Sequence, residues 1–279
     1  MMDVKLQKYI SDCGLMSRRA AEKEIAAGAF AVNGETASLG DRVDPKKDSV
    51  TYRGKPLKKP SGRKTYLILY KPAGIVTTMS DEHGRQTVAD LVKDVPGRLY
   101  PVGRLDKDSE GLLILTDDGE FANRVAHPSG EIRKTYIAFL RGYVENNQLD
   151  RLRAMRVLEG APILPVEVEL LDRCEQVSRV RFVLSEGKNR QIRKMCEAAG
   201  LSVMQLKRIQ IGGIHIGTLS PGEYRRMTPE EKKSLEHRNG PKAASADRKE
   251  QPCRNRTERK PKTSSARTPK TARKPKPRP

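Results

Sequence analysis

A short polar loop holds the residues best suited to chemistry. It spans 103–111, with the sequence GRLDKDSEG, and the apolar run of residues 112–115 that follows is typical of a buried strand. A carboxylate at the mouth of such a strand, with Arg104 two residues before Asp106, is placed to react. Three interpretations of Asp106 and Asp108 stay open: turn residues, ligands of a shared hard cation, or catalytic groups. A cation would need further oxygen ligands, and no acidic or histidine cluster nearby supplies them.

Two later segments carry polar residues at regular spacing. Residues 133–140 alternate as a strand, which places Lys134 and Tyr136 on one face, roughly 7 Å apart. After a strand at 180–185 and a turn at 186–188, we expect Asn189 to cap a helix. Four charged residues of that helix share one face: Arg190, Arg193, Lys194 and Glu197. The tyrosine suits either the edge of a core or a binding site, and the helix face suits either solvent or a phosphate or carboxylate partner.

The first 60 residues predict a small module of two helices and short strands. One helix ends at Gly14, and the next begins with Ser17 as its N-cap and ends at Gly28. Arg18 and Arg19 occupy its first turn, where the helix dipole favours acidic residues. Together with the free backbone N–H groups they form a phosphate site, or else an exposed and mildly unfavourable pair.

The charge of the chain points to a polyanionic partner. The 279 residues include 55 Lys or Arg and 35 Asp or Glu, a net charge of +20. Such an excess favours nucleic acid first and acidic membrane surfaces second. Residues 240–279 contain 14 Lys or Arg, three acidic residues and seven prolines, a net charge of +11, and no large apolar residue. This composition predicts a disordered basic tail.

Other classes of protein are disfavoured by what the sequence lacks. No apolar run approaches the ~18 residues of a spanning helix, and the start of the chain has no secretory signal, so we expect a cytoplasmic protein. The four cysteines and four histidines are scattered, so neither a disulfide framework nor a zinc site is indicated. A Pro/Gly/basic stretch at 58–64 reads as a linker. We therefore predict domains at 1–60 and 64–232, followed by the tail at 240–279.

Several motifs resemble known families. Residues 4–57, centred on LQKYISDCGLMSRRAAEKEIAAGAFAVNG, resemble the alpha-L RNA-binding module of a small-subunit ribosomal protein. Four further motifs occur in order: YKPAG at 70–74, the aspartate block at 103–119, RKTY at 133–136 and LSEGKNRQIRKM at 184–195. Together they resemble the RsuA-type pseudouridine synthases, which isomerise uridine in ribosomal RNA, and EGKNRQIRKMCEAAG is most similar to the RluF-like large-subunit enzymes. This resemblance covers about residues 4–228.

The resemblance implies an α+β fold: a small alpha-L RNA-binding domain, then a catalytic domain with a central mixed, mainly antiparallel sheet flanked by helices. It implies that Asp106 is the catalytic aspartate and that Arg104 helps to displace the target base. Tyr136 would pack on the uracil, and Arg193 would pair with Asp106 and keep it ionised. The RNA contacts would come from the cations and the helix cap already described: Arg104, Lys134, Arg190, Lys194, Ser17, Arg18 and Arg19.

The implied reaction conserves atoms and oxidation state, so no cofactor or metal is expected. The expected partner is ribosomal RNA, most simply of the large subunit, with no membrane, no obligate protein partner and a monomeric enzyme. Three alternatives stay open: a small-subunit target, a non-catalytic ribosome-assembly protein, and a metal-dependent phosphodiesterase built on Asp106 and Asp108.

Overall fold

The computed structural model describes residues 3–58, 62, 64–127 and 130–236. The expected basic tail at 240–279 lies outside the described residues. Within those ranges, no helix combines the length and the apolar character needed to cross a bilayer.

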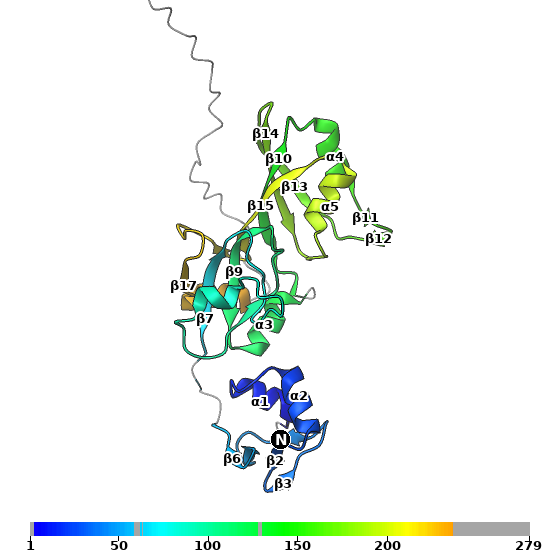
Figure 1. Cartoon of the computed structure of the whole chain (residues 1–279). Coiled ribbons are helices and arrows are strands. Elements are labelled where there is room, and N and C mark those ends of the chain that lie inside the picture. Colours follow the sequence, from blue (N-terminus) through cyan, green and yellow to red (C-terminus); the bar gives the residue numbers. More distant parts are fainter. Residues whose placement is uncertain (1–2, 59–61, 63, 128–129, 237–279) are drawn as a thin grey trace, which may run out of the picture. The chain divides into compact units, whose positions relative to one another are not determined.

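The N-terminal residues build a hydrophobic core of their own. Figure 1 shows the helices and short strands that surround it. Its elements are β1 (Val4–Lys5), α1 (Leu6–Asp12), α2 (Arg18–Ala26), β2 (Phe30–Val32), β3 (Glu35–Thr36), β4 (Arg42–Val43), β5 (Val50–Tyr52) and β6 (Lys55–Pro56). Leu6, Tyr9 and Ile10 of α1 are buried, as their helical spacing predicts. Ser17 caps α2 as expected, since its hydroxyl accepts a hydrogen bond from the Ala20 N–H at 3.1 Å.

A nine-stranded sheet dominates the rest of the described chain (Figure 1). The elements in chain order are β7 (Tyr66–Lys71), η1 (Val88–Val92), β8 (Tyr100–Val102), β9 (Glu110–Thr116), α3 (Gly119–Ala126), β10 (Lys134–Arg141), α4 (Asn146–Ala154), β11 (Val157–Leu158), β12 (Ala161–Pro162), β13 (Glu167–Arg173), β14 (Val177–Leu184), α5 (Gln191–Ala198), β15 (Val203–Ile211), β16 (Ile214–His215), β17 (Tyr224–Arg226) and α6 (Pro229–Glu236). The strand order is β13-β14-β10-β15-β9-β7-β17, with β16 on β15 and β8 on β9. All pairs in this sheet are antiparallel except β15 with β9. The expected mixed, mainly antiparallel sheet is confirmed.

Strands β7 and β9 are apolar throughout because both of their faces are covered. In β9, Leu112 and Ile114 pack into a cluster with residues of α3 and α6, whereas Leu113 and Leu115 pack into a second cluster beneath η1. A strand buried on both faces cannot alternate apolar and polar residues. The continuous apolar run 112–115 therefore holds β9 between two apolar clusters. The loop before β9 is attached to this rigid strand.

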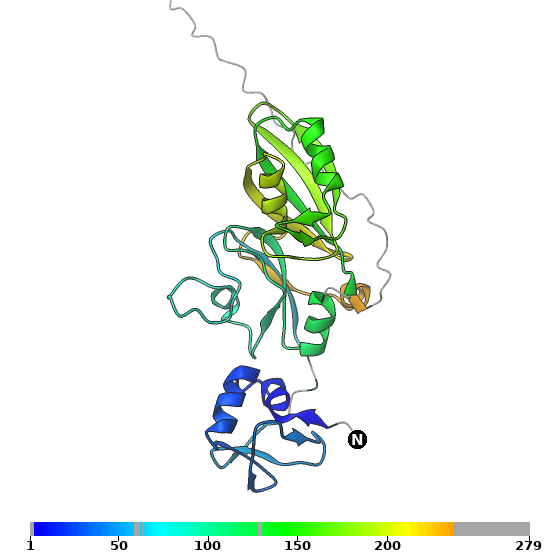
Figure 2. The same ribbon diagram turned by 90° about the vertical axis from the view of Figure 1, so that its right-hand side faces the viewer.

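The other half of the sheet packs against α4 and α5, which cover one face (Figure 2). Leu149 and Leu152 of α4 and Ile192 and Met195 of α5 share a cluster with alternate residues of β10 and β14. Phe182 of β14 is fully buried at its centre. This packing holds the first turn of α5 in place relative to β10 and β14.

The two halves meet where β9 and β15 run parallel. Only two residue pairs are in register there, Lys207 with Glu110 and Arg208 with Gly111. Gly111 has a φ of +109°, and a Cβ at this position would lie 2.2 Å from the carbonyl oxygen of Arg208. Only glycine allows the two backbones to approach so closely.

Candidate active site

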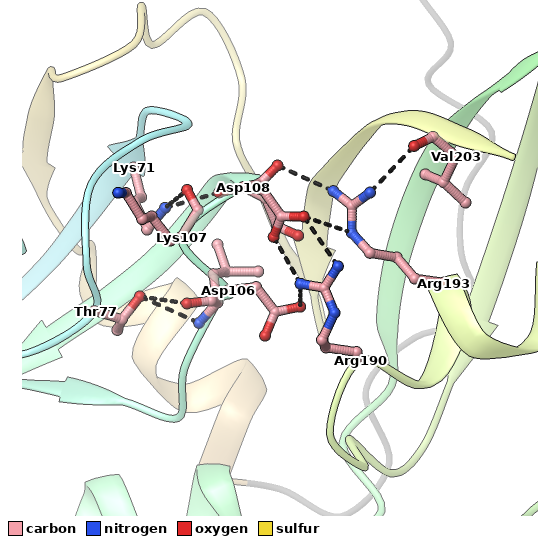
Figure 3. A network of polar contacts seen from close by, with 10 residues as sticks. Lys71, Thr77, Asp106, Lys107, Asp108, Arg190, Arg193 and Val203 are labelled. Atoms are coloured by element: carbon pink, nitrogen blue, oxygen red, sulfur yellow. Dashed lines mark hydrogen bonds and ion pairs between the residues drawn. The ribbon is translucent and has the colours of Figure 1, made fainter. Parts of the chain in front are cut away.

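The loop that carries Asp106 is anchored from β7 and from the segment after it. The Thr77 hydroxyl donates to the Leu105 carbonyl at 2.7 Å and accepts from the Leu105 N–H at 3.3 Å. The Lys71 ammonium donates to the carbonyls of Pro72 at 2.9 Å and Ser109 at 2.7 Å, with Lys107 more distant at 3.4 Å. The backbone on both sides of Asp106 is therefore held by side chains from outside the loop (Figure 3).

Lys71 is fully buried, and this burial lowers its pKa to about 8. The carboxylates of Asp108 and Asp106 act in the opposite direction and favour the charged form. We did not single out this lysine from the sequence. The available signal was a lysine directly after the apolar run 66–70, at a position where the strand pattern calls for burial.

The two aspartates of the loop differ in how firmly they are paired. Arg190 donates to both oxygens of Asp108, at 2.9 and 3.1 Å, and the Arg193 Nε lies 3.3 Å from Asp108 Oδ2. The hydrogen bonds from Arg190 hold the pKa of Asp108 below its usual value. Asp106 has one longer ion pair, 3.7 Å from Oδ2 to the same Arg190, and its side chain is 31% exposed. Figure 3 shows both arginines reaching from α5 toward the loop.

The start of α5 corrects one prediction. Its N-cap is Arg190 and not Asn189, and the helix spans Gln191–Ala198. Arg190 adopts the left-handed conformation, with a φ of +51°, which is uncommon for a residue other than glycine. The tight turn brings the Arg190 guanidinium to both aspartates. The expected inward face is confirmed, since Ile192, Met195 and Ala199 are buried.

The ion pair of Arg193 also differs from the expected one. Its partner is Asp108 and not Asp106. The Arg193 guanidinium is further fixed by hydrogen bonds to the carbonyls of Val203, at 3.2 Å, and Asp108, at 3.0 Å. Arg193 lies about one turn further along α5 than Arg190, and both arginines contact Asp108.

Two other expected site residues, Lys194 and Arg104, make no hydrogen bond or ion pair with Asp106 or Asp108 within the described residues. Lys194 forms an ion pair at 2.5 Å with Glu159, which lies in the turn between β11 and β12. Arg104 is exposed and lines an open cavity of about 530 Å³ with Pro101 and residues of the 76–85 segment. Arg104 therefore extends the site to one side of Asp106, whereas Lys194 does not belong to the cluster around the two aspartates.

Tyr136 and Lys134 lie on β10 beside a buried arginine, Arg208 of β15. The Tyr136 hydroxyl accepts a hydrogen bond from Arg208 Nη1 at 3.4 Å. Burial and the charge of Arg208 together lower the pKa of Lys134 to about 8. No hydrogen bond or ion pair is found for the Lys134 ammonium within the described chain. Arg208 was not predicted, although the alternation of β15 places it between Leu206 and Gln210 on the buried face.

We expect Lys134→Met to stabilise the protein at pH 7, by about 1 kcal/mol after allowing for partial exposure. Below pH 8 the folded protein holds a charged, poorly solvated lysine. Between pH 8 and 10.5 the folded state loses that proton while the unfolded chain keeps it, so the stability of the original protein rises with pH. The advantage of the variant should therefore shrink across this window.

Urea unfolding at pH 7 and pH 10 measures the effect. Lys93→Met is the matched control, because Lys93 is 74% exposed and its ion pair, with Asp90, lies on the surface. It should change stability by less than about 0.5 kcal/mol at both pH values. A Lys134→Met protein that is less stable at pH 7 would contradict the prediction.

The remaining expected residues, Ser17, Arg18 and Arg19, lie at the start of α2 in the N-terminal core. The side chains of Arg18 and Arg19 are exposed, and the first turn of α2 contains no acidic residue. The described residues contain no group of three or more His, Cys, Asp or Glu side chains arranged to hold a metal ion.

Comparison with known proteins identifies relatives that span most of the chain. The family pattern described as RNA pseudouridylate synthase matches residues 65–198. An RNA pseudouridine synthase of Aquifex aeolicus is 41% identical over 229 residues, which is 81% of this chain and 91% of that protein. Ribosomal large subunit pseudouridine synthase B of Bacillus subtilis is 41% identical over 234 residues, 83% and 95% of the two chains. A crystal structure of a pseudouridylate synthase aligns with a TM-score of 0.61 at 31% identity, over 83% of this chain and 99% of the other.

Proposed function

The chain belongs to the RNA pseudouridine synthase family, and from this premise we propose that it converts a specific uridine of large-subunit ribosomal RNA to pseudouridine. The similarity to the Bacillus subtilis large-subunit enzyme, over 83% of this chain and 95% of that protein, supports this substrate. We propose further that the enzyme acts in the cytoplasm as a monomer.

The observation that carries the proposal is the unequal pairing of two neighbouring aspartates. Asp108 is held by two arginines, whereas Asp106 keeps one long contact and a partly exposed side chain. A carboxylate that attacks the sugar, or removes a proton from it, must be able to approach the substrate. Asp106 meets this requirement. Thr77 and Lys71 also fix the backbone around it, so the carboxylate is already oriented before the substrate binds.

The reaction breaks the N1–C1′ bond, rotates the uracil and forms a C5–C1′ bond. C5 loses its proton and N1 gains one, so the composition and the oxidation state of the nucleoside do not change. The target base must first leave its stack, which costs a few kcal/mol. We assign Arg104, exposed at the edge of the open cavity, to the space that the base leaves, and Tyr136 to the surface on which the uracil packs.

The cations away from the reacting atoms serve to dock RNA. Arg190 and Lys134 lie beside the site and suit the phosphates next to the target nucleotide. Arg18 and Arg19, with Ser17 at the cap of α2, suit a phosphate at a second place on the RNA. The tail at 240–279 adds attraction that does not depend on sequence. Such binding falls steeply as the salt concentration rises.

A map of pseudouridine in ribosomal RNA tests the function. Chemical labelling followed by reverse transcription is applied to RNA from cells with the gene, without it, and with the gene returned as Asp106→Ala. We expect one large-subunit position to be modified only in the first strain. A change confined to small-subunit RNA would reassign the substrate. Three identical maps would leave the chain as a non-catalytic RNA-binding protein.

A further inference from the structure

Arg208 is a buried cation without a counterion. Its side chain is only 3% exposed, and within the described residues no carboxylate lies at ion-pair distance from it. Its Nη2 is buried and has no hydrogen-bond partner. A guanidinium in this state costs stability, and an apolar side chain of similar size would cost less. A cost of this kind at the edge of an active site indicates a role in function.

The contacts of Arg208 join three separate parts of the site. Its Nε donates to the Leu112 carbonyl at 2.8 Å, which ties it to the buried strand β9. Its Nη1 lies 3.4 Å from the Tyr136 hydroxyl and 3.5 Å from the Arg104 carbonyl. The guanidinium carbon also lies 5.9 Å from the centre of the Tyr136 ring. One rigid group therefore reaches β9, the loop of Asp106 and the aromatic residue of β10.

The strand register explains why a side chain at position 208 can contact all three parts of the site. Arg208 is paired with Gly111 on one side and with Tyr136 on the other. The missing side chain at Gly111 lets β15 approach β9 closely, and the guanidinium can then reach the carbonyl of the next residue, Leu112. A lysine at 208 would keep the charge but would lack the planar fork that reaches two segments from one nitrogen.

We propose that Arg208 is a positioning residue that sets the Tyr136 ring and the Arg104–Asp106 loop relative to each other. This inference rests on the proposed function, because Tyr136 and Asp106 matter only where a uridine is isomerised. Arg208 itself does not touch the substrate, since its side chain is buried beneath the groups that it holds.

The test is a double-mutant cycle with Arg208→Lys and Tyr136→Phe in the full-length protein. The single-turnover rate and the dissociation constant are measured on a large-subunit rRNA fragment that the unmodified enzyme converts. We expect Arg208→Lys to lower the rate about 10- to 100-fold, because small errors of position cost this much. RNA binding should stay within about twofold of the original.

The cycle separates positioning from general damage. In the Tyr136→Phe background the loss caused by Arg208→Lys should be smaller by about fivefold or more, because the hydroxyl contact is already gone. Tyr143→Phe is the control: Tyr143 is exposed and contacts Arg173, so its effect should simply multiply with that of Arg208→Lys. Multiplicative effects in both backgrounds, or an unchanged rate in Arg208→Lys, would overturn the proposal.

Thermal unfolding and the activity of the unmodified enzyme distinguish the possible causes of a negative result. Thermal unfolding shows whether Arg208→Lys is folded at the assay temperature. If it is not, Arg208→Gln replaces it in the same cycle, because its amide can still donate to Leu112. If the unmodified enzyme converts no rRNA fragment, the proposed function fails. If it is active and the cycle is multiplicative, only the role of Arg208 fails.

Discussion

Replacing Asp106 by asparagine should lower the rate of pseudouridine formation by about 10⁴-fold or more. Asparagine keeps the size of the side chain, and the change removes only one long ion pair with Arg190, at 3.7 Å, so the fold and RNA binding should change little. The amide is neither a nucleophile nor a base toward the sugar, so the loss falls on the chemical step. Chromatography of nucleosides from a single-turnover reaction measures it.

Asp108→Asn is the matched control in the same loop. This carboxylate is bound by Arg190 and Arg193, so its loss should loosen the start of α5 against the loop. We expect a decrease of about 10- to 100-fold, typical of lost orientation. If Asp108→Asn were the more damaging change, the reacting aspartate would have to be reassigned from Asp106 to Asp108.

Gly111→Ala should destabilise the protein by about 3–5 kcal/mol, a large part of the stability of a typical domain. The added Cβ would lie 2.2 Å from the Arg208 carbonyl oxygen and 2.7 Å from its nitrogen. Both are backbone atoms, so relief requires β9 and β15 to separate. The positive φ adds strain of its own. Urea unfolding monitored by circular dichroism measures the free energy of unfolding.

Gly97→Ala separates the two causes. Gly97 has a similar φ, +99°, but a Cβ there would meet no heavy atom within 4 Å. Its cost should be that of the conformation alone, about 1–2 kcal/mol. Equal destabilisation by the two variants would show that the close approach of β9 and β15 contributes nothing.

Local sequence patterns were sufficient to predict the features that depend only on neighbouring residues. The N-cap at Ser17 follows from one hydroxyl and its neighbouring N–H groups. The double-sided burial of β9 follows from four consecutive apolar residues at 112–115. The expected mixed sheet is likewise confirmed, although it came from the family resemblance and not from periodicity.

The features that the sequence did not predict correctly depend on the exact helix boundary or on contacts between segments that are distant in the chain. The cap of α5 is Arg190, one residue after the predicted Asn189, and Arg193 pairs with Asp108 in place of the expected Asp106. The spacing of Arg190 and Arg193 is unchanged, but spacing does not determine the partner. The importance of Arg208 depends on the register of β15 with two strands that are distant in sequence. No local sequence pattern predicts how β15 is aligned with those strands.

The parallel contact of β9 and β15 has a consequence for how the protein can evolve. Two residue pairs join the half that carries Asp106 to the half that carries Tyr136 and α5. A substitution there changes both the amount of folded protein and the turnover rate, so selection against it is stronger than against a change that affects one of them. The outer part of the segment that lines the open cavity, at Glu82 and His83, is exposed and carries no such double burden. Changes of RNA target are therefore expected to arise in that segment first, while the junction of the strands stays fixed.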